Sequence, residues 1–299
     1  MISKQAKVIK KILKASNKKL EHNIKHTLEK RKKYEKSLTA IKLLSRKSKI
    51  EWTDVEGVRV AWVSPLVEDV ERTIIYIHGG GFVYGLSAVH VAYVDRLAEV
   101  CRAKVLLIDY SLSPEARFPV ALNEIYKIWK HLINDGLDPS KAVLMGDSAG
   151  ASLSISVALK LRSNQLPQPS CLVLFSPSVD STLGQESYIY NNDKDIILDK
   201  EIMDYFVDSY VGQTDRTDVL ISPIRADLHS LPSLLLQVGS DEVLLDECKI
   251  FVENAKRDGV DATLKIGKGM WHNWHLSAER MPESSESLKT VADFIAGNC

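Results

Sequence analysis

The sequence predicts an α/β protein whose central, mostly parallel sheet carries helices on both faces. Continuous apolar runs recur along the chain, and such runs suit strands that are buried on both faces of a parallel sheet. Segments of helical character separate them, and this alternation is typical of a doubly wound sheet with right-handed crossovers. The 299 residues, 45% of them hydrophobic, suffice for one large domain with additional segments.

The individual elements follow from local patterns of apolar residues. Residues 58–63 alternate like a strand. Buried strands are expected at 73–77, 105–108, 142–145, 172–175 and 234–238, and a last strand at 263–266. Helices are expected at about 88–102, 119–134, 150–163, 243–258 and 285–296. We therefore assign residues 51–180 and 221–299 to the α/β core.

One stretch, residues 181–220, interrupts this alternation. It holds no run typical of a buried strand, but it contains many polar and aromatic residues. A short connection is expected at this place in the chain. A long insertion at the carboxyl edge of an α/β sheet usually forms a lid over the site, so we expect residues 181–220 to contribute to a cap.

The first 50 residues are expected to be mainly helical. Apolar residues spaced by four or seven draw one stripe along this segment. These residues are Ile9, Leu13, Leu20, Ile24 and Leu28. Because an exposed apolar stripe is a liability, we expect the segment to pack on the rest of the protein as part of the cap.

Charge is distributed unevenly along the chain. The first 50 residues hold 17 Lys or Arg against 3 Asp or Glu, whereas the whole chain holds 39 of each. The basic segment should therefore attract the acidic remainder. Contact with an anionic membrane surface is the less favoured alternative. Nucleic acid is not expected as a partner, because only Tyr34 lies among the lysines to stack on bases.

Several classes of protein are not indicated. The lysine-rich start lacks the apolar segment of a signal peptide, and no run approaches the length of a transmembrane helix. The four cysteines show no CxxC spacing. We expect a cytoplasmic protein that requires no metal and no cofactor.

The strongest signal for chemistry is the sequence Gly146-Asp147-Ser148-Ala149-Gly150. It reads G-x-S-x-G, and it lies between an expected strand and an amphipathic segment. This context holds a serine on a strained turn with its hydroxyl exposed. Ser148 is therefore a candidate nucleophile, which needs a base and a carboxylate that orients the base. Asp147 is not a candidate for that carboxylate, because a sharp turn directs it elsewhere.

A second signal, His78-Gly79-Gly80-Gly81, follows the expected strand at 73–77. Such a glycine loop offers backbone N–H groups with no Cβ in the way of a ligand oxygen. His78 is expected to brace the backbone rather than to transfer protons. In this order, the two signals favour an esterase-type serine hydrolase.

The acid and the base are expected downstream of Ser148, in that order and each after a strand. Asp241 is the best-placed acid, because it follows the strand at 234–238 and a turn. It could also cap the next helix. Glu242 and Asp246 are alternatives, but both are expected to fall inside that helix.

Two histidines compete for the role of base. His272 and His275 both follow the last expected strand at 263–266. His272 is preferred because it comes first in the loop, and His275 remains the alternative.

These features together resemble the hormone-sensitive-lipase-like carboxylesterases (bacterial family IV) of the α/β-hydrolase fold, from about Thr73 onward. The resemblance rests on His78-Gly79-Gly80-Gly81-Phe82, Asp109-Tyr110-Ser111-Leu112-Ser113-Pro114-Glu115, Gly146-Asp147-Ser148-Ala149-Gly150, Ser222-Pro223, Gly239-Ser240-Asp241 and Gly269-Met270-Trp271-His272. It departs from the family pattern at Ala151, where a second glycine is usual, and at Ser111, where arginine is common.

The resemblance implies specific roles for these residues. It makes Ser148 the nucleophile, Asp241 the acid and His272 the base. It assigns the oxyanion hole to the N–H groups of Gly80, Gly81 and Ala149. His78, Gly79, Glu115 and Asp147 are supporting residues of the same motifs.

The resemblance also implies a substrate class. A capped site favours small esters with short acyl chains, cleaved through an acyl-enzyme. Amide or acetyl-group hydrolysis by the same residues is one alternative, and ligand binding on an inactive scaffold is another. A homodimer is common in the family and is a further expectation.

Overall fold

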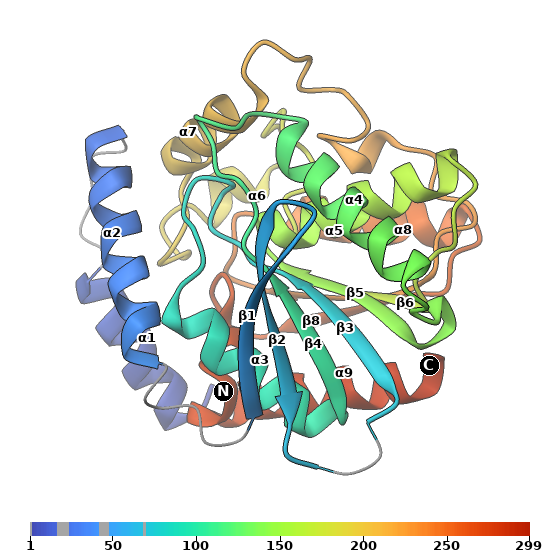
Figure 1. Cartoon of the computed structure of the whole chain (residues 1–299). Coiled ribbons are helices and arrows are strands. Elements are labelled where there is room, and N and C mark those ends of the chain that lie inside the picture. Colours follow the sequence, from blue (N-terminus) through green and yellow to red (C-terminus); the bar gives the residue numbers. More distant parts are fainter. Residues whose placement is uncertain (1, 17–23, 42–47, 68–69) are drawn as a thin grey trace.

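An eight-stranded sheet forms the centre of the protein in the computed structural model, which describes residues 2–16, 24–41, 48–67 and 70–299 (Figure 1). The strand order is β1-β2-β4-β3-β5-β6-β7-β8. The strands are β1 (Ser48–Val55), β2 (Val58–Pro65), β3 (Arg72–Ile77), β4 (Ala103–Ile108), β5 (Ala142–Asp147), β6 (Cys171–Phe175), β7 (Ser233–Gly239) and β8 (Ala262–Gly267).

The sheet is mostly parallel, as predicted. Strand β2 pairs antiparallel with β1 and β4, and the pairs from β4 through β8 are parallel. In register, Ile77 of β3 pairs with both Ile108 and Gly146. The parallel strands therefore end together, and the loops that follow them meet at one edge, where α/β sheets hold their sites.

Helices cover both faces of the sheet. Helices α3 (Ala88–Cys101) and α9 (Pro282–Asn298) share one core with alternate strand residues, including Ile74 and Tyr76. The other core contains Ile75 and Ile77. The helices on that side are α4 (Val120–Asn134), α5 (Ala149–Ser163) and α8 (Leu245–Arg257). Strands β3 to β7 thus supply apolar side chains to both faces, whereas β8 supplies them to one.

Strand β1 is an element that the sequence did not predict. The segment was expected to be helical up to residue 50, but β1 begins at Ser48. Its exposed side chains are polar, including Lys49 and Glu51, and it pairs only with β2 at the edge of the sheet. An edge strand of this kind lacks the apolar run by which the buried strands were recognised.

Two helices, α1 (Lys4–Ser16) and α2 (Ile24–Ile41), lie at one side of the body (Figure 1). On α1, Ile9 and Leu13 pack against a small apolar cluster, as the predicted stripe requires. Leu20 lies outside the described residues, as does the side chain of Ile24. The stripe is wrong at Leu28, which is 43% exposed, because α2 contacts the body mainly through polar and aromatic side chains.

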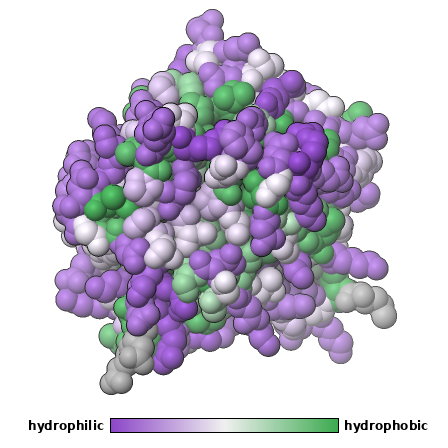
Figure 2. Space-filling model, turned by 90° about the vertical axis from the view of Figure 1, so that its right-hand side faces the viewer, coloured by the Kyte–Doolittle hydropathy of each residue, from purple (hydrophilic) through white to green (hydrophobic). Residues whose placement is uncertain are grey.

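The stretch 181–220 contains two helices, α6 (Ser187–Tyr190) and α7 (Lys200–Val211). Short 3₁₀ turns lie at Pro139–Lys141, Pro223–Arg225 and Trp274–Arg280. None of the helices in the described part of the chain is both long and apolar enough to cross a membrane. The face of the protein shown in Figure 2 is mostly hydrophilic, with apolar side chains in separate patches.

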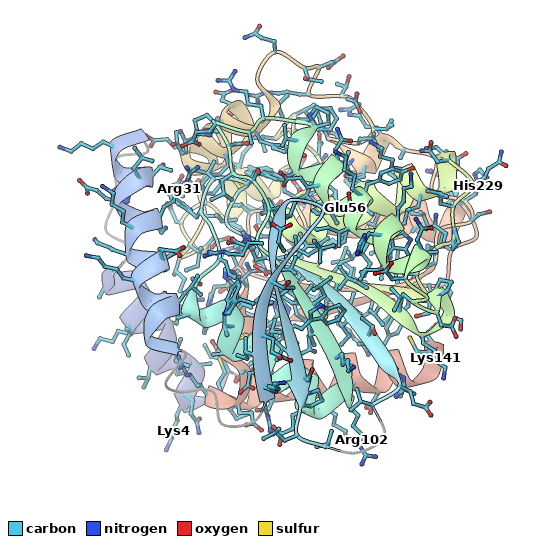
Figure 3. The ribbon with its side chains drawn as sticks, in the orientation of Figure 1. Lys4, Arg31, Glu56, Arg102, Lys141 and His229 are labelled. Atoms are coloured by element: carbon cyan, nitrogen blue, oxygen red, sulfur yellow. The ribbon has the colours of Figure 1, made fainter. Side chains whose placement is uncertain are left out.

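Arg31 attaches α2 to the body. Figure 3 shows it on the side of α2 that faces the sheet. Its guanidinium donates to the carbonyl of Val83 at 2.7 Å and to that of Ser113, and it pairs with Glu115 at 2.8 Å. One side chain of α2 thereby contacts the loops after β3 and after β4.

We predict that Arg31→Ala lowers the free energy of unfolding by about 2 kcal/mol, because charged hydrogen bonds at a side chain only 17% exposed are lost. Lys32→Ala, an exposed neighbour on the same helix, is the control and should change it by less than about 0.5 kcal/mol. Urea unfolding followed by circular dichroism measures both. Equal effects of the two substitutions would show that Arg31 does not attach α2.

Candidate active site

Ser148 lies on a strained turn between β5 and α5. Its backbone angles are φ 51° and ψ −123°, a combination that residues other than glycine rarely adopt. Glycines on either side permit the turn. A Cβ at Gly150 would lie 2.0 Å from the carbonyl oxygen of Ile77, and one at Gly146 would lie 2.5 Å from the carbonyl carbon of Gly150. The G-x-S-x-G pattern therefore reflects backbone segments too close for a side chain.

The glycine loop after β3 also has backbone angles that favour glycine. Gly80 has φ 111° and Gly81 has φ 62°. A Cβ at Gly81 would lie 2.3 Å from the ring of Phe206 on α7. Ala149 begins α5, so its N–H is among the first four, which lack an acceptor within the helix. These are the three residues to which the family resemblance assigns the oxyanion hole.

His272 is paired with Glu242. Its Nδ1 lies 2.9 Å from Oε2 of Glu242, and both side chains are buried. The other carboxylate oxygen of Glu242 accepts hydrogen bonds from Ser176 Oγ at 2.7 Å and from the N–H of Gly239. A carboxylate held in this way fixes the imidazole with Nδ1–H toward Glu242, which leaves Nε2 free to accept a proton.

The prediction that Asp241 is the carboxylate next to the base is wrong. Asp241 instead pairs with Lys10 of α1 at 2.6 Å and is 22% exposed. Helix α8 begins at Leu245, and in the turn before it the carboxylate of Asp241 is held by Lys10 and by the hydroxyl of Ser240. Glu242 therefore lies in the turn after β7, not in the helix, and its side chain points inward beneath His272.

The surroundings of His272 favour its charged form. Burial alone would lower the pKa of His272, but its hydrogen bond with Glu242 and the charge of Glu242 raise that pKa above the usual value. Asp195, from the stretch 181–220, adds to this effect. Burial, with the charge of Glu242, raises the pKa of Asp195 itself to about 6.

His275, the alternative base, lies in an apolar setting. It is fully buried, and its ring stacks on Phe175 with centroids 4.0 Å apart. Burial lowers the pKa of His275 well below the usual value. Neither ring nitrogen has a hydrogen-bond partner among the described residues. Of the two candidates, only His272 has an adjacent carboxylate in this part of the chain.

Asp147 links the loops around Ser148. It is fully buried and accepts hydrogen bonds from Tyr76 at 2.8 Å, from the N–H of Gly79 at 3.1 Å and from Asn273 at 2.8 Å. His90 Nε2 lies 3.8 Å away. We name residues 268–275, after β8, the base loop. Asn273 follows His272 in this loop and Asp147 precedes Ser148, so their hydrogen bond holds the base loop next to the turn that carries Ser148.

His78 and Glu115 support loops rather than face Ser148. His78 stacks on Tyr110 with centroids 4.3 Å apart, and its Nδ1 lies 2.7 Å from the carbonyl of Gly79. Burial, with the charge of His90, lowers the pKa of His78 to about 4, so the ring is neutral at pH 7. Glu115 is the partner of Arg31 described above.

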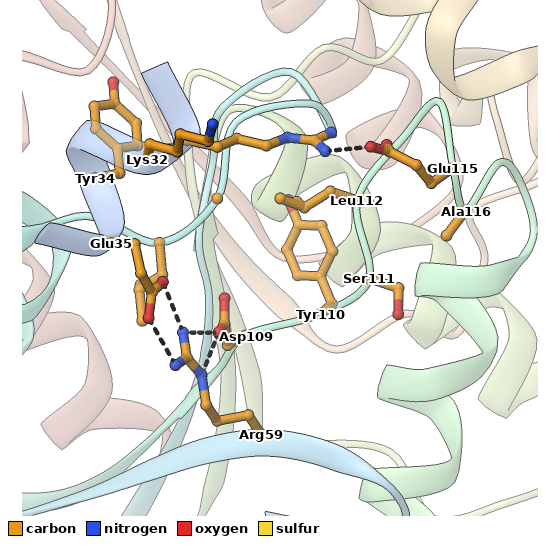
Figure 4. Close-up of a pocket in the computed structure, with 13 residues that line it drawn as sticks. Lys32, Tyr34, Glu35, Arg59, Asp109, Tyr110, Ser111, Leu112, Glu115 and Ala116 are labelled. Atoms are coloured by element: carbon orange, nitrogen blue, oxygen red, sulfur yellow. Dashed lines mark hydrogen bonds and ion pairs between the residues drawn. The ribbon is translucent and has the colours of Figure 1, made fainter. Parts of the chain in front are cut away.

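A cavity of about 630 Å³ opens beside these loops, between α2 and the segment after β4 (Figure 4). Arg59 lies in it between Glu35 and Asp109, at 3.1 Å and 2.5 Å. Neither Ser148 nor His272 lines it. Arg31 and Glu115, and Arg59 with Glu35 and Asp109, are paired with one another in its lining, so the cavity lies apart from Ser148 and His272.

Within the described ranges, no three or more His, Cys, Asp or Glu side chains gather as a metal-binding group. Sequence reasoning also did not anticipate Ser176 and Asn273, which hold the acid and the base loop. Their hydrogen bonds cross between segments far apart in the chain, so no local pattern predicts them.

Comparison with known proteins gives a consistent result. Residues 74–276 match the family described as the alpha/beta hydrolase fold. The chain is 35% identical to an esterase of Acinetobacter venetianus over 224 residues, which cover 75% of this chain and 74% of that protein. It is 32% identical to an acetyl-hydrolase of Streptomyces hygroscopicus over 234 residues, 78% of each. A crystal structure of an esterase from the bacterial hormone-sensitive lipase family superposes with a TM-score of 0.92 at 30% identity, covering 100% of this chain and 99% of that one.

We predict that Asp147→Asn lowers the free energy of unfolding at pH 7 by about 3 kcal/mol, because a buried carboxylate with three donors loses its charge. Burial alone would raise the pKa of Asp147, but His90 and the hydrogen bond from Tyr76 lower it below the usual value. A lowered carboxyl pKa adds stability above the unfolded value of about 3.9, which is lost as the pH falls through the folded pKa.

The difference between the wild type and Asp147→Asn should therefore stay constant from pH 7 to pH 5 and shrink only below about pH 4. Urea unfolding over this range measures it, with exposed Asp193→Asn as the control. A difference that already shrinks at pH 5 would contradict the lowered pKa.

Proposed function

The chain belongs to the α/β-hydrolase fold family and is a carboxylic ester hydrolase of the hormone-sensitive-lipase-like type, and we propose that it cleaves small, short-chain esters with Ser148, His272 and Glu242 as its triad. The observation that carries the proposal is the buried contact of His272 with Glu242. The hydrogen bond from Asn273 to Asp147 supports it, because these residues adjoin His272 and Ser148.

The mechanism is acyl transfer. Ser148 Oγ attacks the ester carbonyl while Nε2 of His272 takes its proton, and Glu242 stabilises the imidazolium that forms. The oxyanion is bound by the N–H groups of Gly80, Gly81 and Ala149. The alcohol leaves with the proton from His272, and water then hydrolyses the acyl-enzyme by the same route.

Helices α1 and α2 and the stretch 181–220 act as a cap in this proposal. Above the glycine loop, Thr27 of α2 and Tyr205 of α7 share a hydrogen bond of 2.7 Å. Phe82 stacks on Tyr210 with centroids 3.7 Å apart, and Phe206 lies against Gly81. Packed rings at this place support a confined acyl pocket, which favours short chains.

Acetyl-group hydrolysis is the second candidate. It is favoured by the similarity to the acetyl-hydrolase of Streptomyces hygroscopicus. The same nucleophile, base and oxyanion donors serve an acetyl ester and an acetyl amide, so leaving-group preference separates the two reactions. Ligand binding without catalysis is less well supported, because the chain has a serine in the G-x-S-x-G turn, Ser148, and a histidine paired with a carboxylate, His272 with Glu242.

The assignment of the triad predicts the order of activities in a set of variants. Ser148→Ala and His272→Ala should lower kcat by about 10⁴-fold or more. His275→Ala should keep most of the activity, because His275 has no adjacent carboxylate. Glu242→Gln should lower kcat by about 10³-fold or more, since the amide neither stabilises the imidazolium nor fixes its tautomer.

These variants are measured with a soluble p-nitrophenyl ester, and circular dichroism shows whether each is folded. In the wild type, kcat/KM should rise with pH, with a midpoint above about 6.5, the ordinary pKa of histidine. The reason is that the pKa of His272 is raised. In Glu242→Gln the midpoint should move to lower pH. A folded Ser148→Ala with wild-type turnover contradicts the proposal.

The confined pocket predicts a dependence on acyl length. Rates on p-nitrophenyl esters should be highest for chains of about C2 to C8 and fall steeply from about C14 onward, because the aromatic walls cannot lengthen without moving the cap. Phe206→Ala, which removes a ring beside Gly81, should shift the preference to longer chains. Faster hydrolysis of emulsified long-chain triglyceride than of short esters would contradict a closed pocket.

A further inference from the structure

Lys10 of α1 contacts both segments that carry the acid and the base. We name residues 240–243, between β7 and α8, the acid turn. Lys10 Nζ lies 2.6 Å from Oδ2 of Asp241 in the acid turn. It also donates to the carbonyl of Gly269, at 3.4 Å, in the loop that leads to His272. One ammonium group thus joins the two segments from outside.

The acid turn and the base loop are also joined directly. The hydroxyl of Ser240 accepts a hydrogen bond from the N–H of Gly269 at 2.7 Å and donates to Oδ1 of Asp241 at 3.0 Å. The N–H of Asp241 donates to the carbonyl of Met270 at 3.1 Å. Each carboxylate oxygen of Asp241 therefore has a donor, one from within the turn and one from Lys10.

Lys10 extends from a helix whose own position is fixed. The backbone N–H and hydroxyl of Ser3 donate to the carboxylate of Glu283, at 2.6 Å and 2.8 Å. Ala6 is fully buried, in a cluster with Trp271 and Trp274 of the base loop. Helix α1 is thereby packed on the loop that carries His272, so Lys10 approaches Asp241 from a defined direction.

Charge gives this contact a second effect. The charges of Glu242, Asp195 and Asp147 act on His272, and Asp195 accepts from the N–H of Val243 at 3.1 Å in the acid turn. Asp241 adds a further carboxylate to that turn, next to Glu242. Lys10 offsets the charge of Asp241. Because Lys10 and Asp241 are only 25% and 22% exposed, water screens this pair less than a surface pair.

We propose that Lys10 is a positioning residue for catalysis, which acts through Asp241 to hold the acid turn and the base loop in the geometry that the reaction needs. The inference rests on the proposed triad of Ser148, His272 and Glu242. In this inference Asp241 is not the triad acid but holds the turn that carries the acid, Glu242. Helix α1 then contributes to the geometry of the active site as well as to the cap.

The test compares four variants with the wild type: Lys10→Met, Lys10→Arg, Asp241→Asn and the double variant Lys10→Met/Asp241→Asn. Lys11→Met, an exposed neighbour on α1, is the matched control. Lys10→Met and Asp241→Asn should each lower kcat on a short p-nitrophenyl ester by about tenfold with KM nearly unchanged, since small misplacements of reacting groups cost rate. Lys10→Arg, which keeps a charged donor at this position, should retain most of the wild-type kcat.

The double variant should be no slower than the slower single variant, because both changes remove one interaction. Kinetics at 25 °C and thermal unfolding are measured together. Lys10→Met with the kcat of Lys11→Met, a loss confined to KM, or losses that multiply in the double variant would overturn the inference. If Lys10→Met does not fold, the kcat values of Asp241→Asn and Lys10→Arg still test the inference, which requires a loss in the first and near wild-type kcat in the second. Full activity of Glu242→Gln would instead refute the triad on which the inference rests.

Discussion

The buried carboxylate of Asp147 is the constraint on which the rest of the site depends. It is buried, and it accepts hydrogen bonds from Tyr76, from the N–H of Gly79 and from Asn273. These donors belong to β3, the glycine loop and the base loop. A buried charge is tolerated only when it is fully hydrogen-bonded, so moving any one loop would leave that charge unsatisfied. Asp147 therefore holds together the segments that carry the proposed nucleophile, oxyanion donors and base.

The two neighbouring carboxylates after β7 have different tasks, which their surroundings determine. Glu242 points inward, accepts from Ser176 and orients His272. Asp241 points outward to Lys10. One turn thus supplies the acid to the interior and an anchor to α1. The basic first segment, which balances an acidic remainder, contacts the body through individual ion pairs at defined places rather than through diffuse attraction alone.

The parallel sheet could be predicted from the sequence because its strands are continuous apolar runs, and the G-x-S-x-G and glycine-loop segments could be recognised because close backbone approach demands glycine there. The edge strand β1 could not, since a polar edge strand carries no such run. The choice between Asp241 and Glu242 could not be made from the sequence, because both lie in the turn before α8 and only their contacts, with Lys10 and with His272, distinguish them. The contacts of Asp147 and Lys10 join residues far apart in the chain, and no local pattern encodes them.

The most direct test of the central claim, that the base loop and the acid turn activate Ser148, is the site at which a serine-reactive p-nitrophenyl phosphonate labels the folded wild-type protein. The account predicts one phosphonyl group per chain, found by mass spectrometry on the peptide that contains Ser148, with ester hydrolysis lost in proportion to labelling. Labelling of another residue with the same loss of activity, or full hydrolysis after Ser148 is completely labelled, would contradict it.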